Sequence, residues 1–369
     1  MKSHLGNLEP KLLQSFTMAV LAASMAATLI SIQTNPSRPL LSLNFRPTRK
    51  PKTKTLAVLG KANTRVPYQL KEGQTRLFHE LPSGMNMEVI LQKGVRNNTG
   101  EEMERSRYPP LVFVHGSFHA AWCWAVHWLS YFSRFGYDCY AVSLLGQGVS
   151  DVPAGDSAGS LQTHASDIAD FIRKEVRLPP VLLGHSFGGL IVQSYLSNMS
   201  GHFSERESLH PRLAGAVLVC SVPPSGNSGL VWRYIFSKPI AAVKVTLSLA
   251  AKAFATSLPL CKETFFSAEM EDHLVQRYQE LMKESSSLPL FDLKKLNASL
   301  PVPSVPISIP VLVLGAGNDF IVDAQGLDET ARFYGVQPVC TEGVAHDMML
   351  DCSWEKGAEV ILSWLKQFE

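Results

Sequence analysis

The N-terminal part of this chain lacks acidic residues. No Asp or Glu occurs from Pro10 to Lys71, whereas ten Lys and Arg residues recur over that stretch among many Ser and Thr. A basic, hydroxyl-rich and acid-free composition is typical of an organellar transit peptide. We therefore expect residues 1–71 to form a disordered targeting segment that directs the chain to the chloroplast, with the mitochondrion or the secretory pathway as alternatives. The remainder is net acidic, and it contains no basic patch with interleaved aromatic side chains that would indicate nucleic-acid binding.

The chain also lacks a convincing membrane span. The stretch from Leu12 to Ile30 is apolar enough to imitate a signal-peptide core or a weak membrane helix, but its many Ala, Ser and Thr residues make it a poor span. Contact with a membrane is therefore compatible with the sequence without being required.

Paired cysteines are missing as well. The six cysteines are scattered, without C-x-x-C or other metal-ligand spacing, and they are Cys123, Cys139, Cys220, Cys261, Cys340 and Cys352. This arrangement predicts buried thiols in a reducing compartment, with neither a disulfide framework nor a metal site.

What the sequence does contain is a glycine-flanked serine between a predicted strand and a predicted helix. The pentapeptide Gly-His-Ser-Phe-Gly at 184–188 follows the apolar run 181–183 and precedes the helix-like run 190–196. A serine hydroxyl is a poor nucleophile at its own pKa, and an active one is held in a sharp strand-to-helix turn near a base. The pattern G-x-S-x-G arises by chance about 0.1 times in a chain of this length. The prediction that Ser186 is a nucleophile therefore depends on the strand before the motif, the helix after it and the acid and base that follow in the chain.

An acid and a base follow Ser186 along the chain. Asp319 comes after the apolar run 310–315 and His346 after the run 337–341, so each is expected on a loop at the C-terminal end of a parallel strand. Ligands bind at that edge of an open α/β sheet, where an acid can fix the tautomer of a histidine. We predict that Asp319 is the acid and His346 the base. Asp323 is the rival acid, although its position favours capping the next helix.

Two backbone N–H groups are needed to stabilise the negative charge that develops on the substrate oxygen. One is expected from Phe187, the residue after the nucleophile, and the other from Ser117, in the loop after the predicted strand 111–114. His115 is expected to brace this loop by hydrogen bonding.

Strand-like and helix-like runs alternate over most of the chain. The runs 76–81 and 86–93 flank a Pro-Ser-Gly turn and predict an opening hairpin. The alternation that follows predicts an α/β fold, in which a mostly parallel central sheet is flanked by helices.

Between Pro223 and Pro310 the pattern becomes helical. The helical runs are 230–236, 240–256 and 268–283, and they are broken by Pro239, Pro259 and Pro289. We expect a helical cap over about 224–306, inserted into a catalytic domain of residues 72–369. Its apolar side chains could line a hydrophobic substrate site, and they include Leu247, Leu249, Phe254, Phe265, Phe266 and Phe291.

Several motifs together resemble the α/β-hydrolase superfamily, and the resemblance covers residues 75–369. The motifs are HGSFHAAWCW at 115–124, LLGQGVS at 144–150, the turn around Ser186, Gly317-Asn318-Asp319, and AHDMML at 345–350. The first motif is similar to the opening motif of plant methylesterases and hydroxynitrile lyases. The last motif is more similar to the corresponding segment of bacterial esterases and lysophospholipases. The chain departs from the pattern at Gln147, where many relatives have histidine, and at Phe187, where leucine or methionine is usual.

The resemblance implies a serine hydrolase of the esterase or lipase type, in a plant plastid, with nucleophile Ser186, acid Asp319, base His346 and oxyanion donors at Ser117 and Phe187. Its substrate would be a small-molecule carboxylic ester, apolar or lipid-like, cleaved through an acyl-enzyme without a metal or organic cofactor. Two alternatives remain open. One is a methylesterase or a hydroxynitrile-lyase-like enzyme that uses the same triad, and the other is a ligand receptor of this fold with little turnover.

Overall fold

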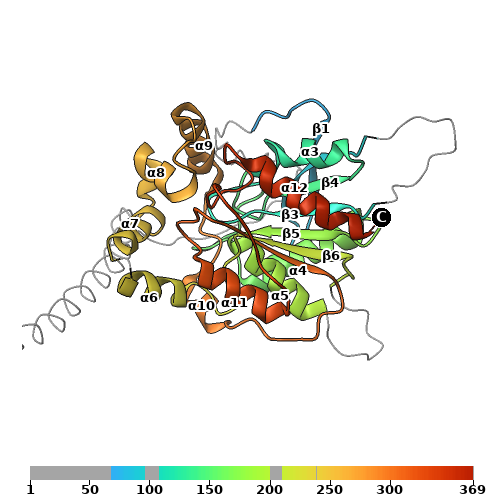
Figure 1. Ribbon diagram of the computed structural model, residues 1–369. Coiled ribbons are helices and arrows are strands. Elements are labelled where there is room, and N and C mark those ends of the chain that lie inside the picture. Colours follow the sequence, from blue (N-terminus) through green and yellow to red (C-terminus); the bar gives the residue numbers. More distant parts are fainter. Residues whose placement is uncertain (1–67, 96–107, 200–209, 238, 369) are drawn as a thin grey trace, which may run out of the picture. The chain divides into compact units, whose positions relative to one another are not determined.

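The computed structural model describes residues 68–95, 108–199, 210–237 and 239–368 (Figure 1). The chain divides into two compact units, Met1–Asn63 and Thr64–Glu369, and all described residues belong to the second. Nearly all of the expected targeting segment 1–71, including the apolar stretch 12–30, lies outside the described residues. Within the described part, no helix has the length and apolar character needed to span a membrane.

A single eight-stranded sheet organises the second unit, with the strand order β1-β2-β4-β3-β5-β6-β7-β8. The strands are β1 (Gln74–Glu80), β2 (Asn86–Gln92), β3 (Leu111–Val114), β4 (Cys139–Val142), β5 (Val181–His185), β6 (Gly215–Val219), β7 (Val311–Ala316) and β8 (Val339–Thr341). β1 and β2 form the expected antiparallel hairpin, β2 also pairs antiparallel with β4, and every later pairing is parallel. The prediction of a mostly parallel α/β sheet is confirmed.

The central strands are buried on both faces, which explains why they are continuous apolar runs. In β5, Leu182 and Leu183 are fully buried but point to opposite faces of the sheet, because side chains alternate along a strand. Leu183 belongs to the hydrophobic core on one side and Leu182 to the core on the other. The sheet is therefore fixed between two packed layers, and the ends of its strands are held at defined positions.

Helices cover both faces. α3 (Trp128–Arg134) and α12 (Trp354–Leu365) lie on one face, and α4 (Leu161–Glu175), α5 (Phe187–Met199) and α11 (Ala324–Tyr334) lie on the other (Figure 1). The short helix α2 (Trp122–Ala125) precedes α3, and the turn η2 (Lys366–Phe368) follows α12. Asp323 caps α11 by accepting the backbone N–H of Gly326 at 2.9 Å, as its position predicts.

The segment between β6 and β7 is helical, and its elements fall inside the expected limits of 224–306. They are α6 (Ser228–Ser237), α7 (Pro239–Leu249), η1 (Ala253–Ala255), α8 (Leu258–Phe265), α9 (Asp272–Ser285) and α10 (Leu293–Ala298). The expected single helix over 240–256 is wrong, since α7 ends at Leu249 and Lys252 has a left-handed backbone (φ 52°). Helix α8 was not expected, because Pro259 reads as a breaker. It stands in the first turn of α8 instead, where proline is tolerated, and Ser257 caps that turn.

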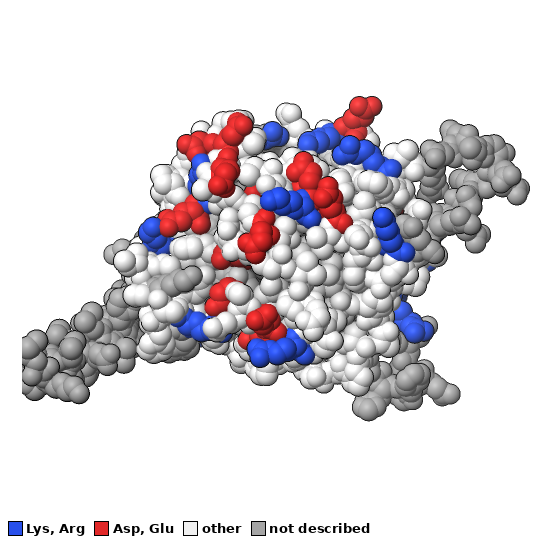
Figure 2. Space-filling model, viewed as in Figure 1, with Lys and Arg blue, Asp and Glu red and all other residues white. Residues whose placement is uncertain are grey.

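Charged side chains of both signs are mixed on the face shown in Figure 2, without a region of one sign. Ion pairs also connect helices of the inserted segment, as between Lys244 and Glu263 at 2.6 Å and between Lys262 and Asp272 at 2.9 Å. These exposed pairs each add little to stability.

The prediction for the cysteines is correct in part. Four thiols are buried, whereas Cys340 and Cys352 are exposed, and all six are free. Cys340 was expected to be buried because it lies in a strand. Its strand, β8, is the last in the sheet and has no partner on its outer side among the described residues, so it is less covered than the central strands.

Candidate active site

Ser186 occupies the sharp turn between β5 and α5. Its φ is 54°, in the left-handed region that a residue with a β-carbon seldom adopts. The turn is held by its own backbone, since the Ser186 N–H donates to the Val219 carbonyl at 3.1 Å and the Ser186 carbonyl accepts the Gly189 N–H at 3.0 Å. Ser186 is only 7% exposed. The structure therefore has the strained strand-to-helix turn that the Gly-x-Ser-x-Gly pattern predicts.

Two glycines let neighbouring loops approach this turn closely. A β-carbon on Gly116 would lie 2.9 Å from the β-carbon of Ser186. A β-carbon on Gly188 would collide with the carbonyl oxygens of Val114 and His115. The loop after β3 therefore packs directly against the serine and the start of α5, which is where an oxyanion-binding loop must lie.

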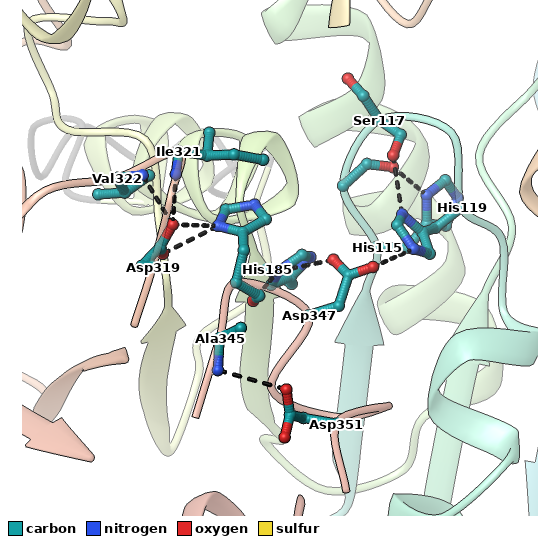
Figure 3. Close-up of polar contacts among 12 residues, drawn as sticks. His115, Ser117, His119, His185, Asp319, Ile321, Val322, Ala345, Asp347 and Asp351 are labelled. Atoms are coloured by element: carbon teal, nitrogen blue, oxygen red, sulfur yellow. Dashed lines mark hydrogen bonds and ion pairs between the residues drawn. The ribbon is translucent and has the colours of Figure 1, made fainter. Parts of the chain in front are cut away.

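Asp319 and His346 meet at the same edge of the sheet. Asp319 follows β7 and His346 follows β8, and His346 Nδ1 lies 3.0 Å from Asp319 Oδ1 and 2.9 Å from Oδ2. Asp319 Oδ1 also accepts the backbone N–H groups of Ile321 and Val322 at 2.7 and 2.8 Å (Figure 3). Both side chains are 2% exposed. The carboxylate is thus fixed by its own loop and holds the imidazole by one nitrogen, leaving Nε2 as the atom that can exchange a proton.

The electrostatic surroundings of His346 favour its charged form. Burial lowers the pKa of the imidazole, but the charge of Asp319, the hydrogen bond to Asp319 and the charge of Asp347 together outweigh burial and raise the pKa of His346 above its usual value of 6.5. A base in this setting can accept a proton and hold it as an ion pair.

The loop that carries His346 contacts the residue next to Ser186. His185 Nε2 donates to the His346 carbonyl at 2.9 Å, and the centres of the two rings are 4.7 Å apart. No hydrogen bond within the described residues joins the Ser186 hydroxyl to the His346 ring. Such bonds between nucleophile and base are often long or poorly aligned before substrate binds.

The two expected oxyanion donors are the backbone N–H groups of Phe187, which directly follows Ser186, and of Ser117, in the loop after β3. Neither the Ser117 N–H nor the Phe187 N–H donates to a carbonyl within the described part of the chain. His115 Nδ1 donates to the Gly116 carbonyl at 2.7 Å, while His115 Nε2 accepts the Leu144 N–H at 3.0 Å. Because the C=O and N–H of one trans peptide point in opposite directions, the bond to Gly116 fixes the direction of the Ser117 N–H.

Burial keeps His115 in the form that this bracing requires. Burial lowers the pKa of His115 to about 3, against a smaller opposing effect of its bond to Gly116. The ring is therefore neutral at physiological pH, with its proton on Nδ1. The expectation that His115 braces the loop is confirmed.

Aromatic side chains of the inserted segment pack beside both donors. Phe254 packs against Phe118, with the rings tilted and their centres 4.8 Å apart, and the ring centres of Phe291 and Phe187 are 5.5 Å apart. These contacts place apolar surface next to the expected reaction centre. Leu247, however, is 50% exposed and does not contribute to this apolar surface.

Gln147, the departure from the family pattern, has a packing role. Its side chain is fully buried, and Nε2 donates to the Leu288 carbonyl at 2.7 Å, in the segment after α9. Gln147 therefore ties the loop after β4 to the inserted segment.

Two overlapping sets of side chains in the described residues have potential metal-ligating atoms within 4.8 Å of one another. They are His185 with His346 and Asp347, and Cys220 with Asp319 and His346. The shared histidine already uses Nδ1 to bind Asp319.

Asp347, the residue after the expected base, is a residue of the site that the sequence does not predict. Asp347 is fully buried and lies 2.9 Å from His119 Nε2, so it links the loop after β8 to the loop after β3. The available signal was a second acidic residue beside the base and a second histidine in the His115–His119 motif.

A model of the alpha/beta hydrolase family matches residues 111–360. Among curated proteins, protein phosphatase methylesterase 1 of Bos taurus is 30% identical over 160 residues, which are 41% of this chain and 42% of that protein. The phospholipase YtpA of Bacillus subtilis is 26% identical over 226 residues, which are 58% of this chain and 76% of that protein. The match to the methylesterase thus spans about two fifths of its length.

Solved structures with a similar fold are more distant in sequence. An esterase from Exiguobacterium antarcticum superposes with a TM-score of 0.58 at 20% identity and covers 79% of this chain and 100% of its own. An epoxide hydrolase from Vigna radiata superposes with a TM-score of 0.56 at 18% identity and covers 80% of this chain and 99% of its own. At these identities the likeness shows the fold alone.

Proposed function

This chain belongs to the alpha/beta hydrolase family, and on that premise we propose that it is a serine hydrolase of carboxylic esters. Ser186 is the nucleophile, His346 the base and Asp319 the acid that orients it. The observation that carries the proposal is the pairing of a positive-φ serine at the end of β5 with an Asp319–His346 hydrogen bond at the ends of β7 and β8. Strained backbone conformations of this kind cluster at active sites.

The proposed reaction proceeds in two halves. His346 Nε2 takes the proton of the Ser186 hydroxyl while Oγ forms a bond to the ester carbonyl carbon, and the carbonyl oxygen becomes an oxyanion. The N–H groups of Ser117 and Phe187 stabilise this oxyanion. When the tetrahedral intermediate collapses, the carbon–alkoxy bond breaks, the alcohol leaves with the proton from His346, and an acyl-enzyme remains. Water, deprotonated by His346, then releases the acid and restores Ser186.

The substrate that these surroundings favour is an apolar ester. Phe118 and Phe254 pack together beside the proposed oxyanion loop, and Phe291 packs on Phe187. Small-molecule sites are typically lined by apolar side chains, with a few polar groups among them. The phospholipase among the relatives supports a lipid-like acyl group, and the methylesterases among them support a methyl ester, so the two ester classes are the substrates to compare.

Serine at position 186 also bears on epoxide opening, the activity named for one structural neighbour. Epoxide hydrolases of this fold use aspartate at the nucleophile position. A carboxylate there forms an ester that water can cleave, whereas an alkyl ether on serine would not be released. The residue at 186 therefore favours acyl transfer.

Replacing Ser186 by alanine tests the proposal. We expect turnover of p-nitrophenyl butyrate and labelling by a fluorophosphonate to be lost, with kcat lower by at least about 10⁴-fold and an unchanged melting temperature. Ser194→Ala is the matched control, because Ser194 is another buried serine, further along α5. A Ser186→Ala enzyme that retains a tenth of wild-type turnover would refute the assignment.

The preferred class of substrate is identified by comparing turnover of methyl esters with turnover of long-chain acyl esters.

A further inference from the structure

A buried carboxylate lies behind the proposed catalytic residues. Asp347 is fully buried, with Oδ2 2.9 Å from His119 Nε2 and Oδ1 3.7 Å from His185 Nε2. Figure 3 shows Asp347 between these two rings, which come from the loop after β3 and from the end of β5. The carboxylate thus binds the loop that carries the proposed oxyanion donor, lies near the end of the strand that leads to the nucleophile, and belongs to the loop that carries the base.

The hydrogen bonds of His119 determine where its protons are. Nδ1 lies 2.8 Å from the Ser117 carbonyl, which can only accept, so Nδ1 carries a proton. Nε2 lies 2.9 Å from Asp347 Oδ2, and this bond also needs a proton, on the ring or on the carboxyl. Burial raises the pKa of Asp347, but the charge of His119, its hydrogen bond and the charges of His185 and His346 outweigh burial and lower it. The Asp347 side chain is therefore held in its carboxylate form.

This pair holds the backbone of the proposed oxyanion donor. His119 binds the carbonyl of Ser117, and His115 binds the carbonyl of Gly116, so both peptide groups that flank Ser117 are held by imidazoles. The next residue, Phe118, has a φ of 68°, a conformation that needs support from its surroundings. The two imidazoles supply that support, and Asp347 fixes one of them.

The same residue also fixes the base loop. The Asp347 N–H donates to the Phe265 carbonyl at 2.9 Å, at the end of α8, and His185 holds the His346 carbonyl on the other side. The backbone of His346 is therefore held from two directions, next to the residue that organises the oxyanion loop.

We propose that Asp347 is a positioning residue for hydrolysis, which acts through His119 to set the Ser117 N–H for the oxyanion. This inference rests on the proposed function, since it concerns the same reaction. It differs from a purely structural role for the pair, which would affect the stability of the fold without a specific effect on the charged intermediate.

The chain offers a matched control in a second buried histidine–carboxylate pair. His79 Nε2 lies 3.0 Å from Asp170 Oδ2, and both residues are less than 10% exposed. This pair joins β1 to α4, and β1 and β8 are at opposite ends of the strand order. Asp170→Ala therefore removes a comparable pair remote from the proposed site.

We would compare Asp347→Ala, Asp347→Asn and Asp170→Ala by kcat and KM on p-nitrophenyl butyrate, by inhibition with an alkyl trifluoromethyl ketone, and by melting temperature. The ketone adds to serine and forms an oxyanion, so its affinity reports the oxyanion site. For Asp347→Ala we expect kcat to fall about 10- to 100-fold with KM within about twofold, and the ketone to weaken in proportion. Asp347→Asn should recover much of kcat, because its amide can donate to a neutral His119 that still binds Ser117.

A second pair of variants separates positioning from stability even if Asp347→Ala does not fold. His119→Asn places an amide where Nδ1 binds Ser117 but does not reach Asp347, whereas His119→Gln reaches Asp347 and loses Ser117. We expect His119→Asn to be less stable yet to keep more kcat than His119→Gln. Activity that follows stability in this pair, or Asp347→Ala with the kcat of Asp170→Ala, would overturn the inference alone. A wild-type enzyme without Ser186-dependent turnover would overturn the proposed function, and this inference with it.

Discussion

The proposed acid can be tested by replacing Asp319 with asparagine. Both Asp319 oxygens lie near His346 Nδ1, at 3.0 and 2.9 Å, and Oδ1 also accepts the N–H groups of Ile321 and Val322. Asparagine keeps one oxygen for these backbone groups, so its NH₂ group faces Nδ1 and favours the tautomer with the proton on Nε2. That tautomer cannot accept a proton from Ser186. We expect kcat to fall by about 10⁴-fold while the loop keeps its conformation.

The same substitution should shift the pH dependence of what activity remains. The base works when it is neutral, so kcat/KM of the native enzyme rises with pH through a pKa above 6.5, where Asp319 and Asp347 outweigh the effect of burial on His346. Without the charge and hydrogen bond of Asp319, burial still lowers the pKa of His346 and less opposes it, so that pKa falls. The acid limb should therefore move to lower pH, and each unit of that movement corresponds to about 1.4 kcal/mol between the two protonation states.

The assay is kcat/KM for p-nitrophenyl butyrate measured from about pH 5 to about pH 9, with stability checked at each pH. Asp323→Asn is the control, because Asp323 is the rival acid and caps α11 through the Gly326 N–H. It should keep the cap, because asparagine caps a helix about as well as aspartate. It should weaken the ion pair with Arg233 and keep the native acid limb. If Asp319→Asn retains more than a tenth of native turnover, or if Asp323→Asn loses as much as Asp319→Asn, the acid has been misassigned.

The surrounding loops and the N-terminal segment give three further predictions. Gly116→Ala places a β-carbon 2.9 Å from that of Ser186, so kcat should fall about 10²- to 10³-fold and overpacking should cost about 1–3 kcal/mol of stability; unchanged kcat would contradict the close approach. Phe254→Ala removes a 1% exposed ring that packs on Phe118 and Phe265, and it should cost about 3–5 kcal/mol of unfolding free energy. It should also raise KM more for long-chain than for acetyl esters, and an equal rise would argue against substrate contact. Residues 1–71 fused to a fluorescent protein should direct it to the chloroplast in plant cells, and accumulation elsewhere would reject that address.

The contact between Asp319 and His346 can be predicted from the sequence because both residues follow parallel strands. Each residue follows a predicted parallel strand, and the carboxyl ends of parallel strands lie at one edge of a sheet. The residues need not be close in the chain, because the order β5-β6-β7-β8 brings their strands together. Their 2.9 Å contact therefore follows from strand recognition and chain direction, without any knowledge of side-chain packing.

The inserted segment was harder to predict because its signals are local and ambiguous. A proline ends a helix in some positions and begins one in others, so the sequence predicts a break at Pro259 where the structure has the first turn of α8. The same limit applies to Asp347. Its burial between His119 and His185 depends on contacts between loops far apart in the chain, which neither periodicity nor spacing encodes.

Backbone strain gives an argument for the site that does not depend on motifs. In the described part of the chain, the non-glycine residues with positive φ are Phe118, Ser186, Cys220 and Lys252. The first three follow β3, β5 and β6, which are adjacent in the sheet, and the Lys252 ammonium lies 5.8 Å from the centre of the Phe118 ring. Each such conformation costs on the order of 1–3 kcal/mol. Residues in such conformations cluster at active sites, so we expect the functional site at the ends of β3, β5 and β6. This expectation uses backbone conformation at two positions, Phe118 and Cys220, that lie outside the Gly-x-Ser-x-Gly pattern.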